Sequence, residues 1–159
     1  MKKIKINNEH IIARYIGYFI NFKNPDQYGI SFGKNSFSNH LKKEYNQPVL
    51  MLNHRDVIGK VNGYDIDENG YIFEVDIYDN KKGREAFYLI DNGLIQQTSF
   101  AYTLNDECVF GENNLIENSK IFDVSFVRSS GLEPGTIDLE NFFINENFFK
   151  NQKNKYYYL

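Results

Sequence analysis

The segment YIFEVDIY at residues 71–78 alternates apolar and acidic side chains, and it constrains the fold more than any other part of the sequence. In an extended chain successive side chains point to opposite faces, so one face of this segment is apolar and the other carries two acids. The apolar positions are Tyr71, Phe73, Val75 and Ile77, and the acids are Glu74 and Asp76. The turn sequence DENG at 67–70 precedes the segment, and residues 57–78 are therefore predicted to form a β-hairpin.

Further segments rich in β-branched and aromatic residues are predicted as strands. They span residues 11–22, 48–52, 94–103 and 118–127. Two short helices are expected, one at residues 36–45 with Ser36 as N-cap and one at residues 80–91 with Asp79 or Asn80 as N-cap. Six or seven strands with so few helices indicate a mainly β, α+β fold. We expect an antiparallel β-barrel or curled sheet, decorated by two or more helices.

The end of the chain differs in character from the rest. Residues 141–159 (NFFINENFFKNQKNKYYYL) mix aromatic residues with Asn and Lys. We interpret them as a C-terminal tail or terminal helix outside the core. A length of 159 residues supports one domain with a core of its own, so residues 1–140 are predicted to form that single domain.

Composition excludes several classes of protein. Hydrophobic residues make up 42% of the chain, which is not typical of intrinsic disorder. The net charge is −3 and the charged residues are interspersed, so no nucleic-acid partner is predicted. No segment approaches the roughly 20 apolar residues of a membrane span, so no membrane partner is predicted. The single cysteine, Cys108, excludes an internal disulfide, and no Cys/His spacing is typical of a zinc site.

Histidine is the first residue type to consider for catalysis. A serine nucleophile requires a neutral imidazole that takes the hydroxyl proton and a third group that orients the imidazole. His54 directly follows the apolar strand at 48–52, whereas His10 is expected to be exposed and His40 to lie on the surface of a helix. A histidine at the end of a strand is often only a turn residue, so position alone leaves the role of His54 open.

The candidate nucleophile is Ser99, inside the predicted strand at 94–103, although a serine on a strand is usually a small polar filler. No G-x-S-x-G motif surrounds it, which disfavours an α/β-hydrolase. The serines at 125, 129 and 130 remain alternatives, and Cys108 with one of the histidines is another.

Asp123 interrupts the apolar strand at 118–127, where simple alternation places it on one face with Ile121, Ser125 and Val127. A carboxylate that points inward requires a partner or a site that stabilises its charge. An edge or bulge position would explain it equally well.

The order of these features resembles that of the prohead serine proteases of tailed phages, which are similar in fold to the herpesvirus assembly proteases. Three motifs carry most of the resemblance. They are VLMLNH at 49–54 followed by Ile58-Gly59, TSFAY at 98–102, and FDVSFV at 122–127. The loop sequences DQYG at 26–29 and GKNSF at 33–37 precede them in the expected order, and the ordered set covers residues 10–138.

The resemblance implies a serine endopeptidase with Ser99 as nucleophile, His54 as general base and Asp123 as the residue that orients His54. His40, Asp56 or another acid remain alternatives for the third position. The implied substrates are segments of the phage capsid and scaffold proteins and the protease itself, with self-association left open. The implied location is the inside of the prohead in the cytoplasm of the bacterial host. No metal or organic cofactor is implied. The leading alternative is an inactive β-barrel assembly module that binds capsid or scaffold protein.

Overall fold

A computed structural model describes residues 1–43, 46–104, 108–128 and 135–151 of the chain. Its strands are β1 (Lys2–Ile4), β2 (Ile11–Asn21), β3 (Val49–Leu52), β4 (Asp56–Ile66), β5 (Gly70–Tyr78), β6 (Gln97–Thr103), β7 (Val109–Phe110), β8 (Ile116–Glu117), β9 (Lys120–Val127), β10 (Gly135–Thr136) and β11 (Phe142–Asn145). Its α-helices are α1 (Ser38–Leu41), α2 (Lys81–Asp91) and α3 (Glu146–Asn151), and short 3-10 helices span Glu112–Asn114 and Leu139–Asn141. The prediction of a mainly β, α+β fold is confirmed.

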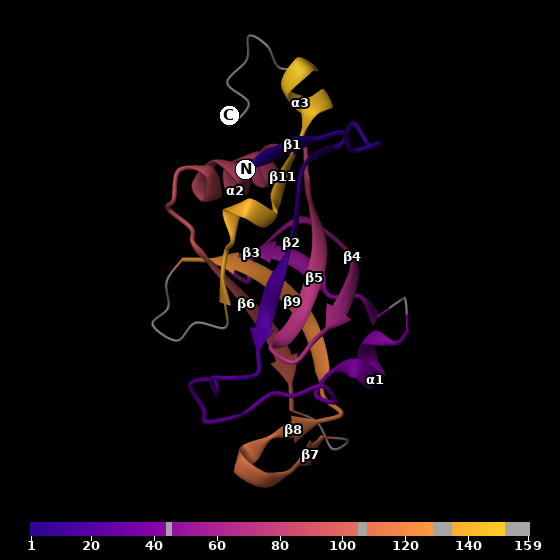
Figure 1. Cartoon of the computed structure of the whole chain (residues 1–159), viewed down its shortest axis with the longest axis vertical. Helices are drawn as coiled ribbons and strands as arrows, with labels where there is room; N and C mark the ends of the chain where they lie inside the picture. Colours follow the sequence, from indigo (N-terminus) through magenta and orange to yellow (C-terminus); the bar gives the residue numbers. More distant parts are fainter. Residues whose placement is uncertain (44–45, 105–107, 129–134, 152–159) are drawn as a thin grey trace.

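The main sheet has nine strands in the order β1-β11-β2-β5-β4-β3-β9-β6-β10, and β7 pairs with β8 in a separate hairpin. This hairpin and α3 lie at opposite ends of the molecule in Figure 1. Most ladders are antiparallel, but β1–β11 and β3–β9 are parallel. The predicted hairpin at 57–78 is confirmed as β4 and β5.

The expected antiparallel β-barrel is not confirmed, because no ladder closes the sheet among the described residues and two ladders are parallel. Strands β2 and β6 do approach each other across the curled sheet (Figure 1), where the hydroxyl of Thr98 donates a hydrogen bond to the carbonyl of Tyr18 (2.7 Å). This contact is a side-chain hydrogen bond, and no backbone ladder between β2 and β6 is found among the described residues. Alternation in a sequence indicates which face of a strand is buried, but it does not indicate the neighbouring strand.

The core lies against the apolar face of β5, as the alternation predicts. The side chains of Tyr71, Phe73, Val75 and Ile77 are all completely buried. Aromatic rings from other strands complete the cluster, with Phe19 at 5.9 Å from Phe73 and 5.6 Å from Phe126 between ring centroids. Aromatic pairs at these separations stabilise a core beyond the area they bury.

The two predicted helices differ in how well they match. Helix α2 begins after Asn80, whose side chain accepts a hydrogen bond from the Gly83 N–H, so this N-cap prediction is confirmed. Helix α1 spans only Ser38–Leu41, and residues 44–45 lie outside the described residues. Ser36 is not its N-cap. Its hydroxyl instead donates to the Ile116 carbonyl (2.6 Å) and accepts from the Gly33 N–H (2.9 Å), which joins the loop before α1 to β8.

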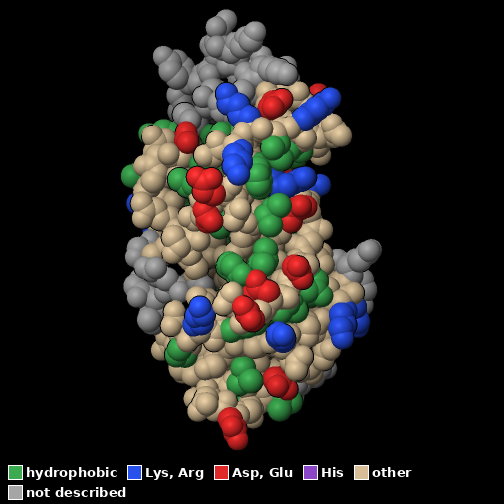
Figure 2. All heavy atoms as spheres, viewed as in Figure 1, with side chains coloured by type: hydrophobic (Ala, Val, Ile, Leu, Met, Phe, Trp, Pro, Cys, Tyr) green, Lys and Arg blue, Asp and Glu red, His purple; other side chains and the backbone are tan. Residues whose placement is uncertain are grey.

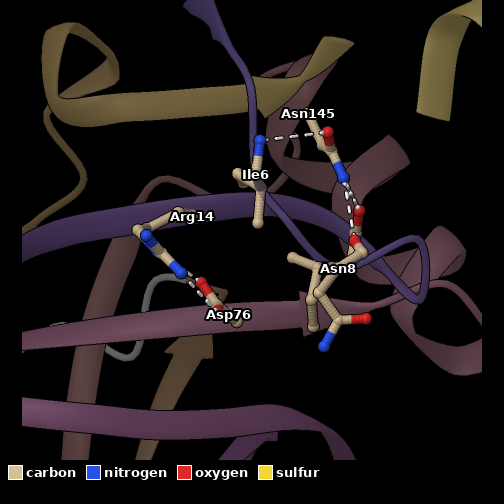
Figure 3. Close-up of polar contacts among 6 residues, drawn as sticks. Ile6, Asn8, Arg14, Asp76 and Asn145 are labelled. Carbon is tan, nitrogen blue, oxygen red and sulfur yellow. Dashed lines mark hydrogen bonds and ion pairs between the residues drawn. The ribbon is translucent and has the colours of Figure 1, made fainter. Parts of the chain in front are cut away.

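Residues 142–148 contribute side chains to the core, which corrects the interpretation that this part of 141–159 lies outside it. Strand β11 pairs with β2, and Phe142 and Phe148 are buried. Asn145 is fully buried, and its side chain accepts from the Ile6 N–H and donates to the carbonyls of Asn8 and Ile11 (Figure 3). In the sequence, a buried asparagine that bonds backbone groups cannot be distinguished from an asparagine on the surface. The four residues of β11 are also too few to show an alternating pattern. Residues 152–159 lie outside the described residues.

One charged pair on β2 and β5 explains an acid that the alternation places on the polar face. Arg14 and Asp76 are partners in the β2–β5 register, and the guanidinium donates two hydrogen bonds to the carboxylate, at 2.8 and 3.0 Å (Figure 3). The hydrogen bond to Asp76 is the largest cause of a raised pKa of Arg14. This bidentate pairing compensates for the burial of Asp76, which is only 2% exposed.

The surface carries both signs of charge. On the face shown in Figure 2, acidic and basic side chains are interspersed. None of the helices in the described part of the chain is long and apolar enough to cross a membrane.

Candidate active site

His54 lies in a tight turn between β3 and β4. Asn53 and His54 both adopt positive φ angles, 52° and 56°, and the Arg55 N–H donates to the Leu52 carbonyl (3.0 Å). Positive φ at both central positions is typical of the type I′ turn that joins twisted antiparallel strands. Left-handed backbone costs free energy for most residues, although asparagine tolerates it. The turn is thus a strained element that requires support from its neighbours.

Strand β9 supplies that support. The Asn53 N–H donates to the Phe126 carbonyl (2.9 Å), and the Asn53 side chain accepts from the Arg128 N–H (3.1 Å). The backbone N–H of His54 donates to the hydroxyl of Ser125 (3.3 Å). The parallel β3–β9 ladder therefore continues into the turn and places the His54 side chain beside β9.

The register of the sheet brings the other candidates to the same place. Ser99 on β6 is directly opposite Ser125 on β9, and Ala101 is opposite Asp123. A β-bulge follows, because Tyr102 pairs with Ile121 and leaves Phe122 without a partner in the ladder.

Because of this bulge, Ile121 lies on the opposite face of β9 from the one that simple alternation predicts. Ile121 packs in the core, whereas Asp123 bonds His54 on the other face, so the two do not share a face as simple alternation predicts. Phe122 is 57% exposed. The extra residue at Phe122 shifts the alternation of side chains by one position. As a result Ile121 faces the core while Asp123 faces His54.

His54 connects Ser99 and Asp123 through its two ring nitrogens. Its Nε2 lies 2.9 Å from the Ser99 hydroxyl, and its Nδ1 lies 2.7 Å from Oδ1 of Asp123. The structure thus brings together all three of the residues predicted from the sequence, from three different strands or strand ends. The order of the contacts is that of a Ser-His-Asp arrangement.

The network assigns the tautomer of His54. An ionised carboxylate only accepts hydrogen bonds, so the contact with Asp123 requires the proton on Nδ1. In a neutral imidazole Nε2 is then unprotonated, and it accepts a hydrogen bond from the Ser99 hydroxyl. This is the protonation state that a general base facing Ser99 needs.

The side chains of Ser99 and His54 are more exposed to solvent than that of Asp123. The His54 side chain is 36% exposed and that of Asp123 is 10% exposed, and Ser99 is half-buried. A reactant in solution can therefore reach Ser99 and His54, while the carboxylate is shielded from water. Shielding strengthens the interaction between Asp123 and a charged imidazole.

The alternatives considered for the third position have other partners. The Nδ1 of His40 accepts from the Ile121 N–H (3.2 Å), and the pKa of His40 is lowered by burial and then by Lys120 and Lys43. The carboxylate of Asp56 is 3.4 Å from the ammonium of Lys82. Neither residue occupies the Nδ1 side of His54.

The alternative nucleophiles are also placed. Ser125 is completely buried and bonds Asp123 rather than Nε2 of His54, and Ser129 and Ser130 lie outside the described residues. The thiol of Cys108 contacts the carbonyl of Thr103 (3.6 Å). His10, as expected, is exposed, with its Nε2 3.7 Å from Glu9.

No group of three or more His, Cys, Asp and Glu side chains in the described ranges is arranged to hold a metal ion. The donors of an oxyanion hole are not assigned, since residues 129–134 after β9 lie outside the described residues.

Reasoning from sequence missed the contacts that two residues make at the site. Asn53 stabilises the turn, and Ser125 bonds the carboxylate of Asp123. A signal for Ser125 was present, because a residue two positions from Asp123 on a strand shares its face.

Comparison with known proteins identifies the family of the chain. A family model for the caudovirus prohead serine proteases matches residues 2–146 of the 159. The chain belongs to this family. The resemblance stated from the ordered motifs is thereby confirmed. A search of curated proteins finds no matching relative. The prohead serine protease match contains His54, Ser99 and Asp123, and it extends through β11 into α3.

Proposed function

We propose that this chain is a serine endopeptidase that cleaves segments of the phage capsid and scaffold proteins, and itself, during prohead maturation. The observation that carries the proposal is the continuous hydrogen-bonded chain from Ser99 through His54 to Asp123. Membership of the prohead serine protease family supports a protease role in phage maturation and a location inside the prohead.

In the first half of the reaction the Ser99 oxygen attacks the carbonyl carbon of the scissile peptide bond. The hydroxyl proton passes to Nε2 of His54 as the new C–O bond forms, and the imidazolium is stabilised by Asp123 on the Nδ1 side. The tetrahedral intermediate collapses when Nε2 returns the proton to the leaving amine, and the C–N bond breaks. The products of this half are an acyl-enzyme at Ser99 and a free amine.

In the second half water replaces the amine. His54 takes a proton from the water as the water oxygen attacks the acyl carbon. The C–O bond to Ser99 then breaks, the Ser99 oxygen takes the proton back from His54, and the carboxylic acid product leaves. The half-buried position of Ser99 supports this sequence because both a peptide and water can reach the hydroxyl.

Covalent labelling tests the chemistry without knowledge of the substrate. A fluorophosphonate reacts with serine nucleophiles that a neighbouring base activates. We expect one adduct per chain, located at Ser99 by peptide mapping, that is absent in Ser99→Ala and His54→Ala and retained in Cys108→Ala. A full adduct yield in Ser99→Ala would refute the assignment of the nucleophile.

Co-expression tests the biological substrate. The chain is expressed with its neighbouring capsid and scaffold proteins, and wild type is compared with Ser99→Ala and Cys108→Ala. We expect processing with wild type and with the cysteine variant, and none with the serine variant. Assembly without cleavage in wild type would favour the alternative of an inactive assembly module that binds capsid or scaffold protein.

A further inference from the structure

Ser125 contacts both Asp123 and His54. Its hydroxyl oxygen lies 2.8 Å from Oδ1 of Asp123, 3.2 Å from Nδ1 of His54, and 3.3 Å from the backbone nitrogen of His54. The residue is completely buried, near the C-terminal end of β9 and directly opposite Ser99 in the β6–β9 ladder.

The chemistry of the groups decides how these contacts are used. A hydroxyl has one hydrogen to donate and two lone pairs. An ionised Asp123 only accepts, so the Ser125 hydrogen points to Oδ1, and the backbone N–H of His54 donates to Ser125. The same Oδ1 then accepts two hydrogen bonds, one from Nδ1 of His54 and one from Ser125.

These two bonds compensate for burial of the carboxylate. Removing a charged group from water is unfavourable unless donors replace the lost hydration. The Ser125 bond also constrains the direction of the Asp123 side chain, so that Oδ1 rather than Oδ2 faces His54. The bond from the His54 N–H helps to hold the strained turn against β9.

We propose that Ser125 is a positioning residue of the site, which aligns the carboxylate of Asp123 with Nδ1 of His54 and anchors the backbone of His54. The proposal rests on the proposed serine protease activity. Ser125 is not a nucleophile in this arrangement, because it is buried and its hydrogen is donated to the carboxylate and not to Nε2.

The first test is a double-mutant cycle in peptide or scaffold cleavage. We expect Ser125→Ala to lower kcat about tenfold and to leave KM unchanged within about twofold, since the lost bond orients the base and does not bind substrate. In the Asp123→Ala background the same substitution should change kcat less than about twofold. Equal losses in both backgrounds would show that Ser125 acts independently of Asp123 and overturn the proposal.

Two matched variants separate positioning from general stability. Ser125→Thr keeps the hydroxyl and should retain more activity than Ser125→Ala. Ser36→Ala removes another completely buried hydroxyl, one that bonds only the Gly33 and Ile116 backbone, and it should lower stability without lowering kcat in the folded protein. A loss of kcat in Ser36→Ala as large as in Ser125→Ala would contradict a specific role.

A spectroscopic measurement remains decisive even if no cleavage is found. The proton on Nδ1 of His54, which is donated to Oδ1 of Asp123, should give a strongly downfield NMR resonance in wild type. We expect it to be lost in Asp123→Ala and shifted upfield or broadened in Ser125→Ala. An unchanged resonance in Ser125→Ala would overturn the positioning role, whereas absence of cleavage and of Ser99 labelling in wild type would overturn the proposed function alone.

Discussion

His54 and Asp123 are 69 positions apart in the sequence, and their Nδ1 and Oδ1 atoms lie 2.7 Å from each other. The contact exists because β3, which ends just before His54, runs parallel to β9, which carries Asp123. The parallel register pairs Leu52 with Phe126, so the turn after β3 lies beside the C-terminal end of β9, where the His54 side chain bonds Asp123.

Replacing Asp123 by asparagine tests the tautomer assigned to His54. An amide can donate to Nδ1, which would place the imidazole proton on Nε2 and remove the lone pair that faces Ser99. We expect kcat to fall by about a thousandfold or more, with similar KM. Asp56→Asn, whose carboxylate bonds Lys82 at the surface, is the matched control and should retain activity. Comparable rates for the two variants would show that Asp123 does not orient His54.

Replacing Asn53 by alanine tests the support of the turn. The substitution removes the acceptor of the Arg128 N–H and places alanine at a φ of 52°. We expect a loss of about 2 kcal/mol in the free energy of unfolding and a lower kcat, with a smaller loss of stability for Asn53→Gly. Denaturant unfolding and cleavage assays measure the two effects.

Asn113→Ala is the control for Asn53. Asn113 also has a φ of 56°, but it lies in the 3-10 helix Glu112–Asn114, outside the site. It should lose stability for the same backbone reason and keep its kcat. If kcat falls equally in both variants, the turn at Asn53 has no special role in activity.

Replacing Phe142 by alanine tests whether the chain after residue 140 belongs to the core. Phe142 is completely buried, and its ring lies 5.4 Å from that of Tyr15 between centroids. We expect the free energy of unfolding to fall by about 3–5 kcal/mol because a cavity remains. Leu139→Ala, at a side chain 45% exposed, should cost less than about 1 kcal/mol. Similarly small losses of stability in the two variants would show that Phe142 does not belong to the core.

The raised pKa of Tyr71 leads to a prediction about how the free energy of unfolding changes at alkaline pH. Burial raises its pKa from 10.0 to about 12, and its hydroxyl donates to the Lys34 carbonyl (2.7 Å). The folded pKa is above the unfolded one, so the stabilisation is complete below pH 10 and is lost as the pH rises through about 12. We expect the free energy of unfolding to decline above pH 10, and to decline less steeply in Tyr71→Phe. An identical slope in the two proteins would exclude Tyr71 as a cause.

Several elements were predictable because they depend on local pattern. The alternation at 71–78 identified the buried face of β5, and Asn80 was identified as the cap of α2. The family was identified by the order of its motifs, which the family match confirms. His54, Ser99 and Asp123 were named as the site on the same basis, and their catalytic roles remain predictions.

Other elements were not predictable because their cause is not local. Helix α1 begins at Ser38, because the Ser36 hydroxyl bonds the distant Ile116 carbonyl and does not cap the helix. Strand β11 pairs with β2, and Asn145 bonds backbone carbonyls near the N-terminus. The barrel was expected from strand count, but closure depends on which strands pair at the edges.

The sequence by itself determined most of the long strands, the buried face of β5, and which residue types could form a serine, histidine and acid site. These follow from the period of the extended chain and from the chemistry of the side chains. Only the tertiary structure decided that these residues meet. The parallel β3–β9 ladder, the left-handed turn at Asn53 and His54, and the bulge at Phe122 set the distances in the site. Each is decided by hydrogen bonds and packing between segments far apart in the chain, which local patterns do not encode.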